Sequence, residues 1–203
     1  LNDLHGLKDQ VHESCIAVEG ELFIKEYSTK SASPQTLSKS LEKLKKLGHK
    51  VDLIIVDYAD LLKPSSAFSE KRNELESIYE DLRGMAQENN CPIWTASQTN
   101  RSGLNAEIIT MESISEAFSK CFVADFIFSI SRTIEDKSNN TGRMFIAKNR
   151  NGPDGIVFPM FIDTASVTMR VMEQSLETPA EIEKNAVKKQ HENLKEKYKK
   201  FRT

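Results

Sequence analysis

Two stretches of the sequence end in polar side chains that could hold a nucleotide and its metal ion. Residues 51–57 form a short apolar run that closes on the carboxylate of Asp57, and residues 91–97 form a second run followed by Gln98. Such runs are typical of strands buried in a parallel sheet, whose carboxyl ends bind ligands. Asp57 could then support the water shell of Mg²⁺, and Gln98 could contact a phosphate. Simpler roles stay open, in which Asp57 caps a turn and Gln98 bonds to the backbone.

Two cations could supply the positive charge that phosphoryl transfer needs. Lys148 and Arg150 alternate beside residues 149–155, a run whose composition predicts a turn. Alternate residues share one face of a strand, so both side chains could clamp phosphate oxygens, including those of a nucleotide bound by a neighbouring subunit. The alternative is an ordinary exposed basic hairpin, and the periodicity does not decide between the two.

Other chemistries find no support in the residues. The sequence contains no Gly-x-x-x-x-Gly-Lys-Ser/Thr loop, so we expect these 203 residues by themselves to bind ATP poorly. It contains no Gly-x-Ser-x-Gly elbow for acyl transfer, and its four histidines lack metal-ligand spacing. The three cysteines are far apart and odd in number, which suits a reducing compartment.

Periodicity and turn signals predict an α/β core that would position these side chains. The expected helices cover residues 1–18, 36–47, 69–90, 111–120 and 179 onwards, and the expected strands cover residues 21–27, 51–57, 91–97, 122–130, 143–148, 156–162 and 167–171. Ser33 is expected to cap the second helix, with Pro34 in its first turn, and residues 131–141 are expected to form a turn or flexible link. This order predicts a mostly parallel sheet flanked by helices, with antiparallel hairpins at one edge.

The composition is that of a soluble globular protein. Hydrophobic residues make up 38% of the chain and charged residues 29%. No apolar run approaches the roughly 20 residues that a membrane-spanning helix needs, so we expect no membrane association. The first residues lack the pattern of a signal peptide. The chain begins on Leu1 rather than Met, which suggests a fragment or a processed product.

Charge divides the chain into two parts. The net charge is −2, but residues 178–203 hold eight Lys/Arg and four Asp/Glu, so this segment is basic and the remainder is acidic. We therefore expect a core over residues 1–177 and a charged helical tail over residues 178–203. The tail could dock on a neighbouring molecule, or it could be a solvated helix.

Several motifs together resemble one family, the replicative hexameric helicases of the DnaB type. The motifs are residues 51–58 as a Walker B strand, Ser97-Gln98-Thr99-Asn100-Arg101, Val123-Ala124-Asp125, and Lys148-Asn149-Arg150-Asn151-Gly152-Pro153, in the order found in that family. Residues 23–27 and the Ser/Thr-rich loop after them are especially similar to the helicases of T-even-type phages. The resemblance covers residues 21–172.

The resemblance implies a truncated RecA-like P-loop NTPase core that uses ATP and Mg²⁺. Asp57 would be the Walker B acid that supports magnesium, and Gln98 would sense the γ-phosphate. Lys148 and Arg150 would reach into the nucleotide site of the neighbouring subunit, with Arg150 as the arginine finger. The phosphate-binding loop of the family would precede Leu1.

The resemblance also implies binding of single-stranded DNA in the channel of a ring, a hexamer in the full-length protein. The DNA-contact candidates are Lys71, Arg72, Arg101 and Glu116. A helicase loader or a primase would be further partners, and the cytoplasm of a bacterial or phage-infected cell would be the location.

Two other functions are compatible with the residues. One is a RecA or recombinase-type ATPase, which shares the Walker B strand. The other is a non-catalytic RecA-like module for assembly or DNA binding, which the missing phosphate-binding loop favours.

Overall fold

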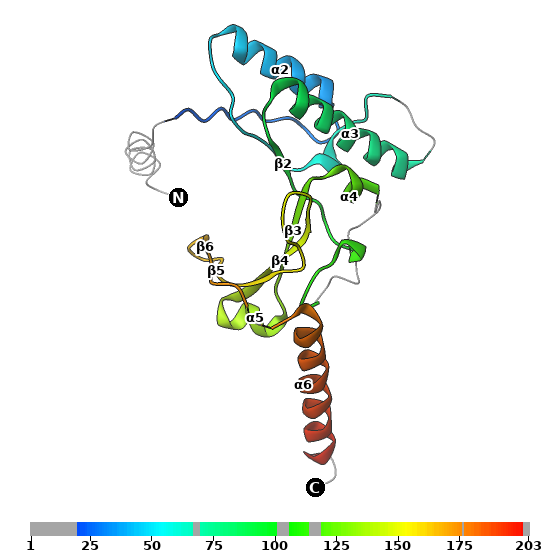
Figure 1. Ribbon diagram of the computed structural model, residues 1–203, viewed down its shortest axis with the longest axis vertical. Coiled ribbons are helices and arrows are strands. Elements are labelled where there is room, and N and C mark those ends of the chain that lie inside the picture. The colour runs from blue at the N-terminus through cyan, green and yellow to red at the C-terminus, as the bar shows by residue number, and fades with distance from the viewer. Residues whose placement is uncertain (1–19, 67–69, 101–105, 114–118, 176, 201–203) are drawn as a thin grey trace.

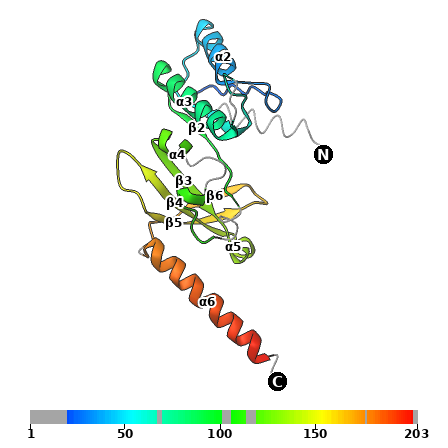
Figure 2. The ribbon, with the colours of Figure 1, turned by 90° about the vertical axis from the view of Figure 1, so that its right-hand side faces the viewer.

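The computed structural model describes residues 20–66, 70–100, 106–113, 119–175 and 177–200. The helices are α2 (Pro34–Lys46), α3 (Lys71–Asn89), α4 (Ser119–Val123), α5 (Ile134–Asn139) and α6 (Pro179–Lys200), with 3-10 turns at Ala59–Leu61 and Met111–Ser113. The strands are β1 (Ile54–Val56), β2 (Ile93–Thr95), β3 (Phe126–Ser131), β4 (Thr141–Asn149), β5 (Val157–Asp163) and β6 (Thr168–Val171). Helices α2 and α3 lie at one end of the molecule, and α6 extends from the other end (Figure 1 and Figure 2).

The predicted cap of α2 at Ser33 is confirmed. The Ser33 hydroxyl accepts a hydrogen bond from the Thr36 amide, the Thr36 hydroxyl accepts one from the Ser33 amide, and Pro34 lies in the first turn. Gly48, two residues after the helix, has φ +90°. Glycine adopts this left-handed conformation without steric cost, so the helix ends where the sequence predicts.

One face of the parallel pair β1–β2 packs against α3. Ile55 lies opposite Trp94 in the register of the two strands, and the residues on either side of Ile55 turn toward α3. There Val56, Ile78 and Leu82 are at most 9% exposed and form the centre of a hydrophobic core. Burial of these apolar side chains holds the two strands on the helix.

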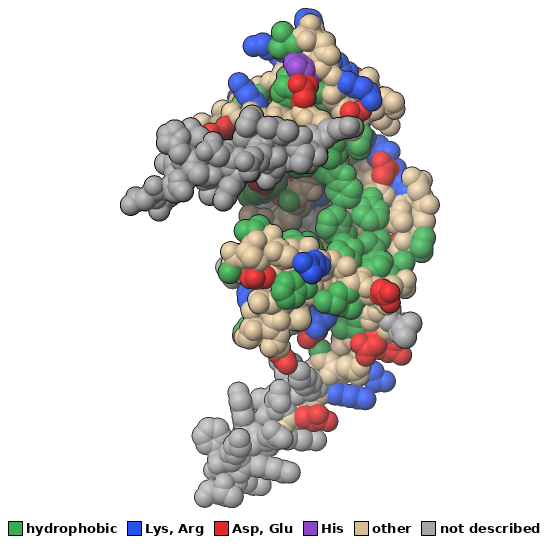
Figure 3. Space-filling model, turned by 90° about the vertical axis from the view of Figure 1, so that its left-hand side faces the viewer, with side chains coloured by type: hydrophobic (Ala, Val, Ile, Leu, Met, Phe, Trp, Pro, Cys, Tyr) green, Lys and Arg blue, Asp and Glu red, His purple; other side chains and the backbone are tan. Residues whose placement is uncertain are grey.

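The other face of β1–β2 is exposed, which corrects the prediction that these strands are buried on both sides. Ile55 is 71% exposed and Trp94 is 42% exposed. The Trp94 ring lies 5.9 Å from the Phe126 ring and 5.7 Å from the Phe128 ring, between centroids, so the apolar surface continues onto β3. Figure 3 shows a broad band of hydrophobic side chains on one face of the molecule. Apolar residues on both faces predicted full burial, but in the described chain only the α3 side is covered.

Strands β3 to β6 form an antiparallel sheet in sequential order. Its core contains Phe145 and Val157, which pack with Ile108 and with Ile182 of α6. The fold is therefore mixed α/β as expected, and the expected antiparallel hairpins are confirmed for β4, β5 and β6. A mostly parallel sheet is wrong for the described residues, where two strands pair in parallel and four are antiparallel. Short turns join β4 to β5 and β5 to β6, and short turns permit only antiparallel neighbours.

Some predicted boundaries are also wrong. Residues 21–27 form no strand, and Leu22 and Ile24 are more than 80% exposed there. Part of the expected link over residues 131–141 is helical, because Thr133 and Asp136 form a capping box that starts α5. The expected helix over residues 1–18 lies outside the described residues, as do residues 114–118.

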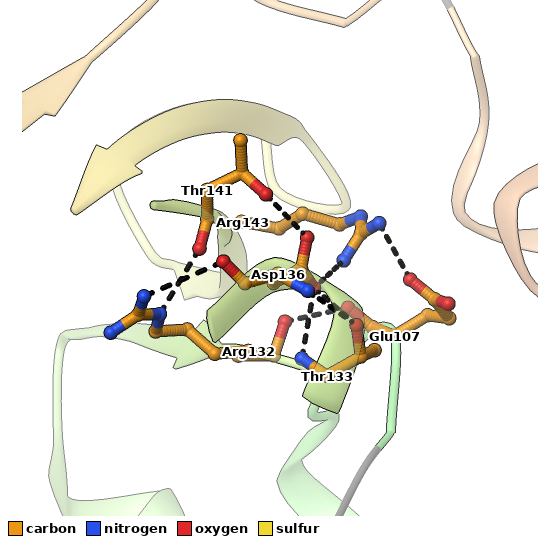
Figure 4. Close-up of polar contacts among 7 residues, drawn as sticks. Glu107, Arg132, Thr133, Asp136, Thr141 and Arg143 are labelled. Carbon is orange, nitrogen blue, oxygen red and sulfur yellow. Dashed lines mark hydrogen bonds and ion pairs between the residues drawn. The ribbon is translucent and has the colours of Figure 1, made fainter. Parts of the chain in front are cut away.

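A buried carboxylate fastens α5 to β4. Asp136 accepts hydrogen bonds from the Thr133 amide and hydroxyl and from the Thr141 hydroxyl, each at 2.8 Å, and Arg143 forms an ion pair with it (Figure 4). Burial alone would raise the pKa of Asp136, but these hydrogen bonds and the Arg143 charge outweigh burial and lower the pKa to about 2. The ionised form of Asp136 therefore stabilises this junction.

Helix α6 is attached mainly through its first turn. Thr178 and Glu181 form a capping box, and Ile182 is 9% exposed against the core of the antiparallel sheet. Beyond this turn the helix extends away from the body of the molecule (Figure 2). Residues Pro179–Lys200 are helical, and the division of the chain into a core and a charged tail stays a prediction. No helix among the described residues has both the length and the apolar character to cross a membrane.

Ile78 and Ile55 provide a test of whether only one face of the parallel strands is buried. Ile78→Ala should lower the free energy of unfolding by about 2–5 kcal/mol, because it leaves a cavity between α3 and the strands. Ile55→Ala should lower it by less than about 1 kcal/mol, because its side chain is already in water. Urea unfolding of both variants measures the difference. Equal losses would show that the face carrying Ile55 is covered in solution.

The low pKa of Asp136 makes a prediction for acid stability. Asp136→Asn should cost about 2 kcal/mol at pH 7, because the ionised group is stabilised in the folded state relative to the unfolded state. The contribution of Asp136 is complete above its ordinary pKa near 3.8 and is lost as the pH falls through about 2. Unfolding curves of the wild-type and variant chains should therefore converge near pH 2. A constant difference between pH 7 and pH 2 would contradict the assignment.

Candidate nucleotide and DNA site

The carboxyl ends of β1 and β2 bring the first predicted pair of residues to one edge. Gln98 Nε2 donates a hydrogen bond to the Tyr58 hydroxyl at 2.9 Å, and Tyr58 directly follows Asp57. Thr95 joins the two strand ends, because its hydroxyl donates to the Val56 carbonyl and accepts from the Ala59 amide. The parallel register thus places Asp57 and Gln98 as the sequence predicts.

Asp57 presents its carboxylate to solvent at this edge. Its side chain is exposed, and no described residue forms an ion pair or hydrogen bond with it. Among the described residues there is no cluster of three or more His, Cys, Asp or Glu that could enclose a metal. A single carboxylate fits Mg²⁺, which keeps several waters and takes its other ligands from substrate phosphates. The donor set therefore suits magnesium held with a nucleotide.

A buried ion pair lies directly behind this edge. Lys120 of α4 is 3% exposed, and its ammonium group lies 2.9 Å from Asp60 Oδ2. Asp60 also accepts hydrogen bonds from the Tyr79 hydroxyl at 2.8 Å and from the Ser97 hydroxyl at 3.2 Å. Burial raises the pKa of Tyr79, and the Asp60 charge raises it further, so the hydroxyl stays protonated and donates.

No motif in the sequence predicts that these residues form a cluster. Asp60 follows Asp57 by three residues and Ser97 precedes Gln98, so position next to a predicted site residue was the available signal for both. Lys120 carries no such signal, because it is 60 residues from its carboxylate partner.

The second predicted pair, Lys148 and Arg150, meets at the carboxyl end of α4. Lys148 Nζ donates to the carbonyls of Cys121 and Phe122 at 2.7 and 3.2 Å. Arg150 Nη2 donates to the Phe122 carbonyl at 2.7 Å. Cations are favoured at this end of a helix, where the last carbonyls have no partner within the helix. The two side chains therefore meet at the last carbonyls of α4, although Arg150 lies in the turn after β4 rather than on the strand.

Asp125 completes the arrangement around Arg150. One of its oxygens lies 2.9 Å from Arg150 Nη1 and 2.9 Å from Arg83 Nη1, so one carboxylate holds two guanidinium groups. Arg83 also donates to the Val123 carbonyl. Arg150 is 45% exposed and Asp125 is 55% exposed, so these ion pairs are screened by water and readily exchanged. In the single chain Arg150 thus turns back onto α4 and Asp125.

A β-bulge determines which way Lys148 points. Phe128 pairs with Ile146 and Ile127 pairs with Lys148, so Ala147 is an extra residue on β4. Directly opposed residues of antiparallel strands share a face. Without the extra residue Lys148 would join Ile146 on the apolar face with Phe128, and the bulge instead turns it to the face that carries α4. Burial lowers the pKa of Lys148, and the nearby Arg150 charge lowers it further.

The two pairs of predicted residues lie on different parts of the structure. Asp57 and Gln98 are at the ends of the parallel strands, Lys148 and Arg150 are at the end of β4, and no hydrogen bond or ion pair between described residues joins one pair to the other. Helix α4 contacts both regions, through Lys120 on one side and through its last carbonyls on the other.

The predicted DNA contacts are only partly within the described structure. Arg72 is exposed in the first turn of α3, and Lys71 begins the same helix. Arg101 and Glu116 lie outside the described residues. The prediction that these four residues contact DNA remains a prediction.

Two solved structures share the fold of this chain. The chain matches a solved ATPase domain with a TM-score of 0.61 and 24% identity, over 70% of this chain and 52% of that one. It matches a structure of a DnaB-like replicative helicase and its interactions with primase with a TM-score of 0.64 and 23% identity, over 81% of this chain and 40% of that one. At these identities the likeness establishes the fold alone.

Sequence comparison then assigns the family. The model of the DnaB-like helicase C terminal domain matches residues 7–170, and the chain belongs to this family. It is 31% identical over 120 residues to a DnaB-like replicative helicase of Enterobacteria phage T4, and 29% identical over 139 residues to a probable replicative DNA helicase of Trieres chinensis. These alignments cover 57% and 64% of this chain. The chain spans 25% and 30% of the length of those two relatives.

Proposed function

We propose that the chain is part of the RecA-like P-loop NTPase motor of an ATP-dependent replicative DNA helicase, which translocates on single-stranded DNA as a ring. The observation that carries this proposal is the hydrogen-bonded edge formed by Tyr58 and Gln98 beside the exposed Asp57, at the ends of two parallel strands. Open α/β sheets bind their ligands at this place. Membership of the DnaB-like family supports the same reading.

The residues of this edge would act on the metal-bound nucleotide. Mg²⁺, when bound, would neutralise charge on the β- and γ-phosphates. The Asp57 carboxylate would accept hydrogen bonds from water in the shell of that ion and so fix its position. The Gln98 amide, already oriented by Tyr58 at 2.9 Å, would contact the γ-phosphate or the attacking water.

Lys148 and Arg150 would act on the nucleotide of a neighbouring subunit. Phosphoryl transfer depends mostly on positioning and on stabilising charge in the transition state, and an arginine supplied by another subunit can do both. Arg150 is 45% exposed and bound to the exposed Asp125, so it can exchange this carboxylate for phosphate oxygens at small cost. The ring, and a helicase loader or primase as further partners in the cell, belong to the same proposal.

The phosphate-binding loop is the part of the site that these residues do not contain. The 203 residues include no Gly-x-x-x-x-Gly-Lys-Ser/Thr motif. In this proposal the backbone amides and the lysine that hold the phosphates come from polypeptide other than these residues. The missing motif also favours the second candidate function, a non-catalytic RecA-like module that assembles with a complete motor or binds DNA. Membership of the helicase family leaves the recombinase-type alternative without support.

The role of Arg150 as an arginine finger is tested in the full-length protein. Arg150→Ala should lower kcat for ATP by about 10³-fold or more while changing ATP-analogue affinity little, because an arginine finger stabilises the transition state more than the ground state. DNA-stimulated phosphate release and fluorescent-analogue titration measure the two quantities. Lys137→Ala, which changes an exposed cation of α5, is the matched control. Unchanged turnover in Arg150→Ala refutes the finger, and absence of any ATPase activity in the wild-type protein favours the non-catalytic module.

The DNA assignment is tested by salt dependence. Arg72→Ala should weaken binding to single-stranded oligonucleotide and reduce the slope of log K against log salt by about 0.7, which is the value for one lost phosphate contact. Fluorescence anisotropy at several salt concentrations measures this slope, again with Lys137→Ala as the control. An unchanged slope would show that Arg72 does not contact a DNA phosphate.

A further inference from the structure

Helix α4 is the element that touches both halves of the candidate site. It has only five residues, and its first three, Ser119 to Cys121, are at most 6% exposed. We infer that Asp60 and Lys120 are positioning residues, whose buried ion pair sets the place of α4 and, through the last carbonyls of α4, the place of Lys148 and Arg150. This inference rests on the proposed function for the role of Arg150, but its structural part can be measured without any ATPase activity.

The Asp60–Lys120 contact is built as a rigid joint. Both charges are largely removed from water, since Lys120 is 3% exposed and the Asp60 side chain is 15% exposed. Tyr79 supports the joint twice, because its hydroxyl donates to Asp60 at 2.8 Å and its ring lies 5.7 Å from the Lys120 ammonium group. A buried ion pair adds little to overall stability compared with apolar residues, yet it tolerates only one geometry. Such a contact is suited to positioning.

The same joint reaches the segment that carries Gln98. Ser97 donates to Asp60 Oδ2 at 3.2 Å, and the Lys120 ammonium group contacts the same oxygen at 2.9 Å. A displacement of Ser97 and Gln98 by bound nucleotide therefore changes the partners available to Lys120. The segment that meets the nucleotide and the helix that carries the cations share one carboxylate oxygen.

The opposite end of α4 holds the cations through its backbone. Lys148 and Arg150 donate to the carbonyls of Cys121 and Phe122, which immediately follow Lys120. Because the backbone of a helix moves as a unit, displacement of Lys120 carries these acceptors with it. The positions of Lys148 and Arg150, which would contact a neighbouring subunit, thus depend on the conformation of the Gln98 segment in the same chain.

Thiol labelling of Cys121 and Cys91 measures whether α4 is displaced. Both cysteine residues are 3% exposed, but Cys121 lies in α4 and Cys91 lies just before β2. Full-length wild-type protein and the Lys120→Met, Lys120→Arg and Asp136→Asn variants are treated with a thiol reagent, and each site is quantified by peptide mass spectrometry. The Asp136→Asn variant also loses a buried ion pair, but one without contact to α4.

Lys120→Met should raise the labelling rate of Cys121 by about tenfold and leave that of Cys91 unchanged, because it releases α4 locally. Lys148 should become more reactive toward an amine reagent in the same variant, as its carbonyl acceptors move. Lys120→Arg should restore much of the protection. Full protection of Cys121 and Lys148 in Lys120→Met, or equal exposure of Cys121 in Asp136→Asn, overturns the inference.

The functional part is read from the kinetics of the same proteins. Lys120→Met should lower kcat for ATP about tenfold or more with KM nearly unchanged, since misplacing a catalytic group by about 1 Å has effects of this size. In a double-mutant cycle with Arg150→Lys, Lys120→Met should be non-additive and Asp136→Asn additive. Additivity in both cycles overturns the coupling to Arg150. A wild-type protein without ATPase activity refutes the proposed function instead, while the labelling results still decide whether Lys120 positions α4.

Discussion

The ion pair between Lys120 and Asp60 holds the candidate site together. It joins residues 60 positions apart and is almost closed to water. Because a buried charge without its partner is costly, the turn after β1, the segment after β2 and helix α4 have little freedom to separate. Asp57 and Gln98 emerge from the two strands on one side of this joint, and the acceptors of Lys148 and Arg150 lie on the other.

Hydrophobic burial explains only one side of the parallel strands. The core between α3 and the strands holds Val56, Ile78 and Leu82, whereas Ile55 and Trp94 on the opposite face are largely in water. Large apolar patches on a protein surface usually mark places where another molecule packs. The chain spans 52% of the solved ATPase domain that it matches. Within the described residues the parallel strands are therefore covered on the α3 face alone. Their carboxyl ends, where the candidate site lies, are nevertheless held together by hydrogen bonds.

Local geometry, more than charge pattern, decides how the basic residues are used. The extra residue Ala147 turns Lys148 away from the apolar face and toward α4. Asp136, held ionised by Thr133, Thr141 and Arg143, anchors the start of the strand that carries this bulge. The exposed pair of Arg150 with Asp125 can exchange partners, whereas the buried pair of Lys120 with Asp60 is costly to break.

The local features could be predicted from the residues alone: the Ser33 cap, the strand before Asp57, the turn after Lys148 and the helical tail, because capping and periodicity act over a few residues. Motifs then led to the family that the comparisons confirm. Three features became visible only in the folded chain: which strand face is covered, that β3 pairs antiparallel with β4, and that Lys120 lies on Asp60. Those outcomes depend on contacts between distant residues and on a one-residue bulge, and periodicity over a short window carries no information about either.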